Sequence, residues 1–169
     1  MFEQWDALCA VLFSFSIAQE LKTHADIVNQ KGEKIGKAEL IQTNSGVLIK
    51  LEASNLPPNA ELAFHIHELG KCDPPDFKSA KGHFNPFKKK HGLLNPEGPH
   101  AGDMPNIHTD DKGNVRVQVL NPFVTLKKGK KNSLFKEGGT ALVIHGGPDD
   151  YKSDPAGNAG KRIACGVVK

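Results

Sequence analysis

Residues 62–75, LAFHIHELGKCDPP, place two histidines two positions apart in an apolar run. In a β-strand, residues i and i+2 project from the same face, so His65 and His67 would point toward one spot. A lone histidine is more often an ordinary core or surface residue than a ligand. The pair therefore has two interpretations, a metal site or an accident of composition, and the rest of the chain has to decide between them.

Short alternating segments separated by turn residues make up most of the chain. Seven segments share this pattern: residues 22–30, 32–43, 46–56, 61–69, 113–120, 139–147 and 161–169. Alternation of apolar and polar residues between turn signals is typical of strands, and no segment has a 3.6-residue apolar period of helical length. The sequence therefore predicts an all-β protein, a sandwich or a barrel.

Length and charge exclude some function classes. The 169 residues suit a single domain, and the formal net charge is only +3. No stripe of Lys and Arg with interleaved aromatics is present, so nucleic acid is not an expected partner. The run FKKKHG (residues 87–92) is interpreted as a solvated loop.

The N-terminus differs in kind from the rest. Residues 7–18, ALCAVLFSFSIA, are uncharged and apolar, too short to span a bilayer and typical of the core of a secretory signal. Glu3 and Asp6 stand where a signal has positive residues, so a misplaced start codon and an uncleaved hydrophobic tail remain as alternatives. We expect residues 1–18 to be a signal peptide, residues 19–169 the mature domain, and the location periplasmic or otherwise extracytoplasmic.

Cysteine usage agrees with export. Of three cysteines, Cys9 lies in the expected signal, which leaves Cys72 and Cys165 as a single pair. A pair of this kind suits an oxidising compartment, and two unrelated buried thiols are the alternative.

A span of some 40 residues, 70–109, has little strand character, and such a span needs a function or a cross-link to exist in a compact domain. Metal binding would order it. Four imidazoles without a carboxylate suit Cu(II), whereas three imidazoles and one carboxylate suit tetrahedral zinc. Seven candidate ligands would have to fill eight positions, so one imidazole would serve both metals through its two nitrogens: His65, His67, His83, His91, His100, His145 and Asp103.

Six blocks carry a family resemblance: FHIHELGKC, GHFNP, KHG, PHAGDMPN, VIHGGPDD and GNAGKRIACGVV. In this order they resemble the copper/zinc superoxide dismutases, from about residue 33 to the C-terminus. The resemblance implies an eight-stranded antiparallel Greek-key β-sandwich or barrel with two long functional loops, and dismutation of superoxide to dioxygen and hydrogen peroxide. It implies one copper and one zinc per chain. The copper ligands would be His65, His67, His83 and His145, and the zinc ligands His83, as the bridge, with His91, His100 and Asp103.

The resemblance also assigns roles outside the ligand sets. Cys72 and Cys165 would form the family's intrasubunit disulfide. Asp149, otherwise an ordinary turn residue, would accept N–H bonds from copper and zinc ligands, and Arg162, otherwise a strand-edge charge, would lie beside the copper and attract the superoxide anion. His83 would also carry a proton to the reduced product.

Only 16 residues separate His145 from Arg162, which resembles the exported bacterial branch of the family. No stable protein partner is evident from the sequence, and a monomer or a homodimer is expected. The alternative function is an exported copper/zinc-binding protein that buffers metal without turnover. Such a protein would need the same ligands but not Arg162.

Overall fold

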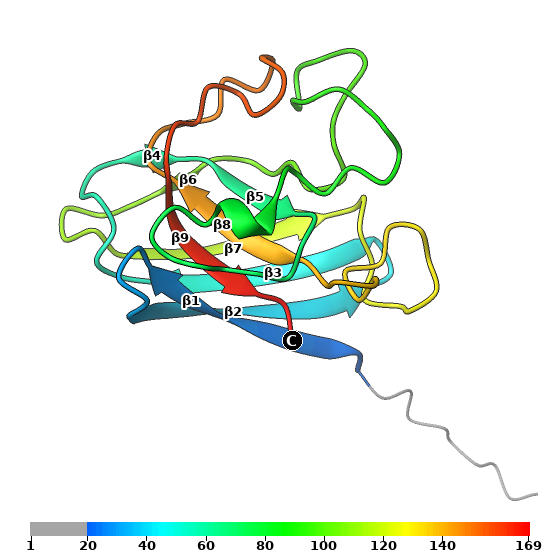
Figure 1. The fold of residues 1–169 in the computed structure, drawn as a ribbon, viewed down its shortest axis with the longest axis horizontal. Helices are drawn as coiled ribbons and strands as arrows, with labels where there is room; N and C mark the ends of the chain where they lie inside the picture. The colour runs from blue at the N-terminus through cyan, green and yellow to red at the C-terminus, as the bar shows by residue number, and fades with distance from the viewer. Residues whose placement is uncertain (1–19) are drawn as a thin grey trace, which may run out of the picture.

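The computed structural model describes residues 20–169 (Figure 1). The expected signal peptide, residues 1–18, lies outside the described residues. Within residues 20–169, no helix is long and apolar enough to cross a membrane. The strands are β1 (Lys22–Asn29), β2 (Lys34–Thr43), β3 (Gly46–Ala53), β4 (Glu61–Leu62), β5 (Phe64–His67), β6 (Ile107–His108), β7 (Val115–Asn121), β8 (Ala141–His145) and β9 (Arg162–Val167). A single turn of 3-10 helix, η1 (Lys78–Ala80), accompanies them.

Seven strands form one antiparallel sheet in the order β5-β8-β9-β1-β2-β3-β7, and β4 pairs with β6 in a second, small sheet. The large sheet curls into a half-barrel around the core, as Figure 1 shows. Two neighbouring pairs, β5 with β8 and β3 with β7, are far apart in the sequence. The long connection that follows β5 carries the first functional loop, and the second, residues 146–161, joins the adjacent strands β8 and β9. The all-β expectation is confirmed.

Alternating burial explains why these segments are strands. In β3, Val47, Ile49 and Leu51 are fully buried, whereas Leu48 and Lys50 between them are partly exposed. Each such buried aliphatic side chain stabilises the fold by roughly 1.5–3 kcal/mol relative to an exposed one. A one-residue shift in register would turn this apolar row to solvent, so the pattern also fixes the pairing.

The expected strand at residues 61–69 is divided. Ala63 separates β4 from β5, and the two halves belong to different sheets. The partner of β4 is the two-residue β6, which no alternating pattern predicts. With β4 and β5 taken as one interrupted segment, the chain has the eight strands that the family resemblance implies.

The long loop is fixed along the free edge of β5. The Ile66 N–H donates to the Gly102 carbonyl (2.9 Å), and the Ile66 carbonyl accepts from the Phe84 N–H (2.8 Å). Glycine is required at 102, because a Cβ there would lie 2.2 Å from the Ile66 oxygen. This pairing places the residues that follow Gly82 and Gly102 directly beside the two histidines of β5.

Candidate metal centre

Three elements bring four histidines together. His65 and His67 project from β5 on the face opposite Phe64 and Ile66, which pack in the hydrophobic core. The loop paired with β5 supplies His83 opposite His67, and His145 ends the neighbouring strand β8. All four histidines are buried, and their ligand atoms lie within 4.8 Å of one another.

Each of the four histidines turns one nitrogen inward without a hydrogen-bond partner: Nδ1 of His65 and Nε2 of His67, His83 and His145. A buried polar atom without a partner is rare and needs an explanation. Four converging nitrogens, with no thiolate or carboxylate among them, suit a Cu(II) ion in a tetragonal arrangement. The residues present therefore fit copper.

The outer nitrogens explain why the inner ones are available as ligands. His65 Nε2 lies 2.8 Å from a carboxylate oxygen of Asp149, and His67 Nδ1 lies 2.9 Å from the Lys81 carbonyl oxygen. His145 Nδ1 lies 3.3 Å from the Gly160 carbonyl oxygen. Because these oxygens only accept, the ring nitrogens facing them are the protonated ones. The opposite nitrogens then present lone pairs to the centre of the cluster.

A second cluster contains three imidazoles and one carboxylate: His83, His91, His100 and Asp103. Asp103 Oδ1 lies 2.8 Å from His83 Nδ1, 3.2 Å from His91 Nδ1 and 3.4 Å from His100 Nδ1. A tetrahedral zinc with bonds of roughly 2.0–2.1 Å would separate its ligands by about 3.3 Å. These separations therefore fit a zinc ion that would replace the direct contacts.

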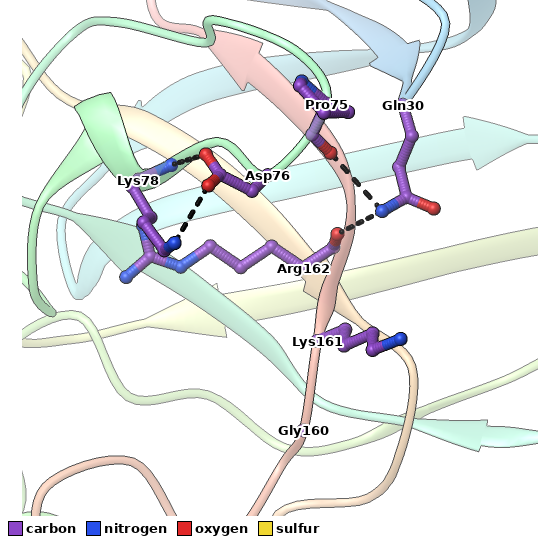
Figure 2. Close-up of a pocket in the computed structure, with 7 residues that line it drawn as sticks. All are labelled: Gln30, Pro75, Asp76, Lys78, Gly160, Lys161 and Arg162. Carbon is purple, nitrogen blue, oxygen red and sulfur yellow. Dashed lines mark hydrogen bonds and ion pairs between the residues drawn. The ribbon is translucent and has the colours of Figure 1, made fainter.

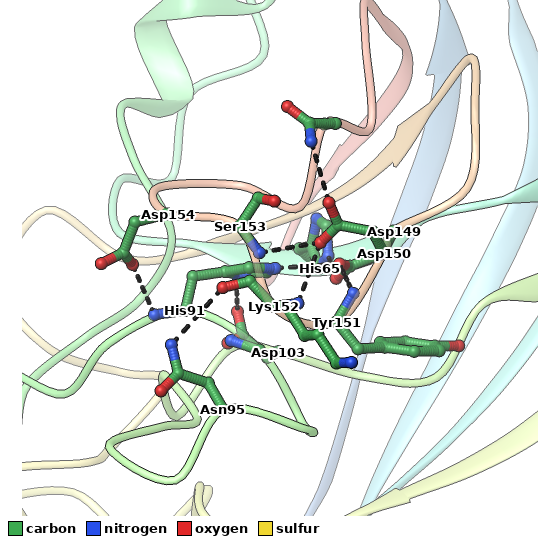
Figure 3. A network of polar contacts seen from close by, with 12 residues as sticks. His65, His91, Asn95, Asp103, Asp149, Asp150, Tyr151, Lys152, Ser153 and Asp154 are labelled. Carbon is green, nitrogen blue, oxygen red and sulfur yellow. Dashed lines mark hydrogen bonds and ion pairs between the residues drawn. The ribbon is translucent and has the colours of Figure 1, made fainter.

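His83 belongs to both clusters. Its Nε2 faces the first cluster and its Nδ1 faces the second. Asp149 makes a second connection, because its two carboxylate oxygens accept from His65 Nε2 at 2.8 Å and His91 Nε2 at 2.9 Å (Figure 3). One ring and one carboxylate thus join the two sites.

Gly157 leaves room for this carboxylate. Its φ is +62°, and a Cβ added there would lie 1.8 Å from Asp149 Oδ1 and 2.7 Å from His91 Nε2. Any side chain at 157 would collide with the connection between the two clusters.

The metal-free cluster keeps its imidazoles in a form that can bind metal. Burial is the largest influence on His83 and His145; it lowers the pKa of His83 to about 4 and that of His145 to about 3. Burial also holds the pKa of His67 well below its ordinary value. These rings are therefore neutral near pH 7. A neutral ring keeps the lone pair that a metal requires.

The carboxylate side of the cluster behaves differently. Burial alone would raise the pKa of Asp103, but hydrogen bonds from histidines of the second cluster outweigh it and hold this pKa far below its usual range. For His91, burial lowers the pKa, and the hydrogen bonds to Asp103 and Asp149 outweigh burial and raise it to about 9. Two carboxylates thus offset positive charge at the second cluster. Such an environment suits a divalent cation.

Arg162 lies at the start of β9 beside the first cluster. Its Nη1 donates to the Phe77 carbonyl (2.7 Å) and its Nη2 to the Lys81 carbonyl (2.6 Å). The Lys81 oxygen is also the acceptor for His67, so one carbonyl positions both the arginine and a ring of the first cluster. Figure 2 shows Arg162 extending from β9 along a cavity of about 500 Å³ lined also by Gln30, Pro75, Asp76, Lys78, Gly160 and Lys161.

The disulfide between Cys72 and Cys165 is present, with a Cα–Cα distance of 5.6 Å. The alternative of two free thiols is therefore excluded. The bridge ties β9, next to Arg162, to the loop that carries Phe77 and Lys81.

Sequence reasoning missed the support of Asp149. The side chain of Asn106 accepts from the Asp149 N–H (2.9 Å) and donates to the Asp149 carbonyl (3.1 Å). The Asn106 N–H in turn donates to the Tyr151 hydroxyl (2.7 Å). No pattern in the sequence singles out a loop asparagine or the tyrosine that binds it. The remaining two histidines, His24 and His108, are not among the grouped ligands.

Comparison with known proteins agrees with this geometry. Residues 34–168 match the family model described as copper/zinc superoxide dismutase. The chain is 82% identical over 159 residues to "Superoxide dismutase [Cu-Zn] 2" of Aquifex aeolicus, covering 94% of this chain and 93% of that protein. It is 41% identical over 140 residues to "Superoxide dismutase [Cu-Zn]" of Caulobacter vibrioides, covering 82% of this chain and 80% of that protein.

Solved structures show the same fold. A double mutant of a SOD-like protein from Bacillus subtilis aligns with a TM-score of 0.84 and 46% identity, over 86% of this chain and 95% of that one. The Cu/Zn superoxide dismutase of Brucella abortus aligns with a TM-score of 0.71 and 27% identity, over 88% of this chain and 100% of that one. On the match over residues 34–168 and the identity to relatives of similar length, the chain belongs to the copper/zinc superoxide dismutase family.

Proposed function

We propose that the chain converts two superoxide anions and two protons into dioxygen and hydrogen peroxide. One observation carries the proposal, namely that His83 faces a four-nitrogen cluster with one ring nitrogen and a three-imidazole, one-carboxylate cluster with the other. Copper would be held by His65, His67, His83 and His145, and zinc by His83, His91, His100 and Asp103. When bound, copper supplies one-electron exchange, and zinc supplies a fixed positive charge without redox chemistry.

His83 has a role in proton delivery in this proposal. Holding both metals would require both ring nitrogens of His83 to be deprotonated, and Nε2, once released, would accept a proton. That proton lies at the first cluster, where the reduced anion needs it. Nδ1 would stay engaged at the second cluster, where Asp103 also lies, and this would keep the ring oriented.

Arg162 would bind and orient the anion. Two of its five N–H groups are used to fix the guanidinium on the carbonyls of Phe77 and Lys81. The remaining N–H groups present a planar set of donors to a small anion. A protein that only stores metal has no use for a guanidinium held in this way.

Export and assembly form part of the proposal. The disulfide and the apolar run at residues 7–18 both suit an extracytoplasmic protein, with residues 1–18 removed as a signal and residues 19–169 remaining as the mature domain. We assign no protein partner to the reaction, which needs only superoxide, and a monomer or a homodimer would suffice.

The decisive experiment loads the purified chain with copper and zinc, measures both metals, and follows superoxide decay after pulse radiolysis. We expect one equivalent of each metal and catalytic decay in proportion to bound copper. The matched control is His145→Ala, which removes a residue of the first cluster only. Full metal loading without faster decay than the control would mean that the chain buffers metal without turnover.

A further inference from the structure

Six exposed lysines come from two loops: Lys88 and Lys89 from the loop after β5, and Lys127, Lys128, Lys130 and Lys131 from the connection between β7 and β8. We call them the basic face. Among residues 20–169, none of the six forms an ion pair with a carboxylate, in contrast to Lys90, which pairs with Asp154 at 3.2 Å. Residues 77–96 and 112–136, which contain them, hold no Asp or Glu. No carboxylate close in sequence therefore offsets this positive charge.

One aromatic contact joins the two loops. The Lys131 ammonium lies 5.5 Å from the centre of the ring of Phe87, the residue that precedes Lys88 in the sequence. Phe87 is itself 46% exposed. Phe123, 40% exposed, lies in the same connection as Lys131, and its carbonyl accepts from Asn132 Nδ2 at 2.7 Å. The basic face thus includes apolar aromatic surface among its charges.

The backbone of the connection between β7 and β8 is fixed by buried side chains and hydrogen bonds. Leu126 and Leu134 are buried in the core. The Leu134 N–H donates to the Thr125 carbonyl (2.9 Å), and the Thr125 N–H donates to the Asn132 carbonyl (3.1 Å). Because the backbone is already fixed, binding through these lysines orders only side chains, and the entropic cost is correspondingly small.

The first strand begins at the same end of the barrel. The Gln42 N–H donates to the Leu21 carbonyl (2.9 Å), and the Gln42 side chain accepts from the Leu126 N–H (2.7 Å). The chain therefore enters β1 beside the residue that precedes Lys127, as Figure 1 shows for the start of β1 and the yellow β7–β8 connection. The apolar run of residues 7–18 precedes this point in the sequence.

We propose that the basic face docks this protein on an anionic phospholipid bilayer. All six cations are lysines, which attract a diffuse layer of headgroups as point charges, whereas phosphate-specific and nucleic-acid sites favour the bidentate fork of arginine. Exposed aromatic rings between lysines suit the boundary between headgroups and acyl chains.

The test measures binding of the full chain to vesicles of phosphatidylcholine, with and without phosphatidylglycerol. Because the full chain includes the apolar run, binding to neutral vesicles is the baseline, and the gain on adding the anionic lipid is the measured quantity. Lys127→Gln/Lys130→Gln removes two charges that contact no aromatic ring. The matched control, Lys31→Gln/Lys112→Gln, removes two exposed lysines from turns at the opposite end of the strands.

We expect the gain in vesicle binding on adding phosphatidylglycerol to shrink roughly 25-fold in Lys127→Gln/Lys130→Gln, at roughly five-fold per lysine, and to stay unchanged in the control. Salt should weaken the gain, and superoxide-consuming activity should be equal in both variants. Equal binding to both vesicles, or an equal loss in the control, would overturn the proposal. Tighter binding to duplex DNA than to anionic vesicles, with the same sensitivity to Lys127 and Lys130, would assign the basic face to nucleic acid instead.

Discussion

The disulfide provides the sharpest test of how the fold supports the site. Replacing Cys72 and Cys165 with alanine removes a cross-link between residues 93 positions apart. The chain-entropy model assigns such a closure roughly 4.6 kcal/mol at 25 °C. For a domain of this size, 1 kcal/mol corresponds to roughly 2–4 °C in Tm, so the metal-free double variant should melt roughly 9–18 °C lower.

The assay is scanning calorimetry of the metal-free chain, since bound metal would add its own stabilisation. Cys9→Ala in both proteins prevents exchange with the third thiol. The loop released by the substitution carries the Phe77 and Lys81 carbonyls that fix Arg162, so the metal-loaded variant should also lose activity. A Tm change of less than about 3 °C, or full activity in the loaded variant, would show that the loop holds its place without the bridge.

The remaining predictions concern single groups of the site. Asp103→Ala should lose zinc preferentially and His145→Ala copper preferentially in elemental analysis, and loss of both metals from both folded variants would contradict the partition. Arg162→Ala should lower the rate of superoxide decay severalfold with both metals retained, and Arg162→Glu should lower it further. The matched control Arg116→Ala should leave the rate unchanged, and the wild-type rate should fall with rising salt. The metal-free chain should become less stable to urea as pH falls from about 6.5 toward about 4. In the folded chain the pKa of His83 is lowered to about 4 and that of His145 to about 3. Over this pH range the unfolded chain therefore binds protons that the folded chain does not. A urea midpoint that stays level over this range would refute the buried, neutral state of these rings.

Much of the fold could be predicted from the sequence, because burial of one sheet face leaves an alternating pattern. Val47, Ile49 and Leu51 show this in β3. The two-residue strand β6 is too short to alternate, and it forms only because β4 offers it an edge. The division of residues 61–67 at Ala63 depends on tertiary pairing that no local pattern reports.

The metal ligands of the site could be predicted from the sequence, but the residues that support them could not. The histidine pair on a strand, together with the histidines and the carboxylate of the long loop, indicated metal, and the family resemblance assigned each residue to copper or zinc. Asn106 was not predictable, because its role depends on where the loops bring it relative to Asp149. Gly157 was not predictable either, since only the approach of Asp149 reveals why a side chain is excluded there.

The central claim, two different metals that share His83, is tested most directly by crystals of the loaded chain and anomalous difference maps at the copper and zinc edges. The account predicts one copper peak among His65 Nδ1 and the Nε2 atoms of His67, His83 and His145, and one zinc peak against His83 Nδ1. Zinc in both positions, or a copper peak that does not contact His83, would contradict it.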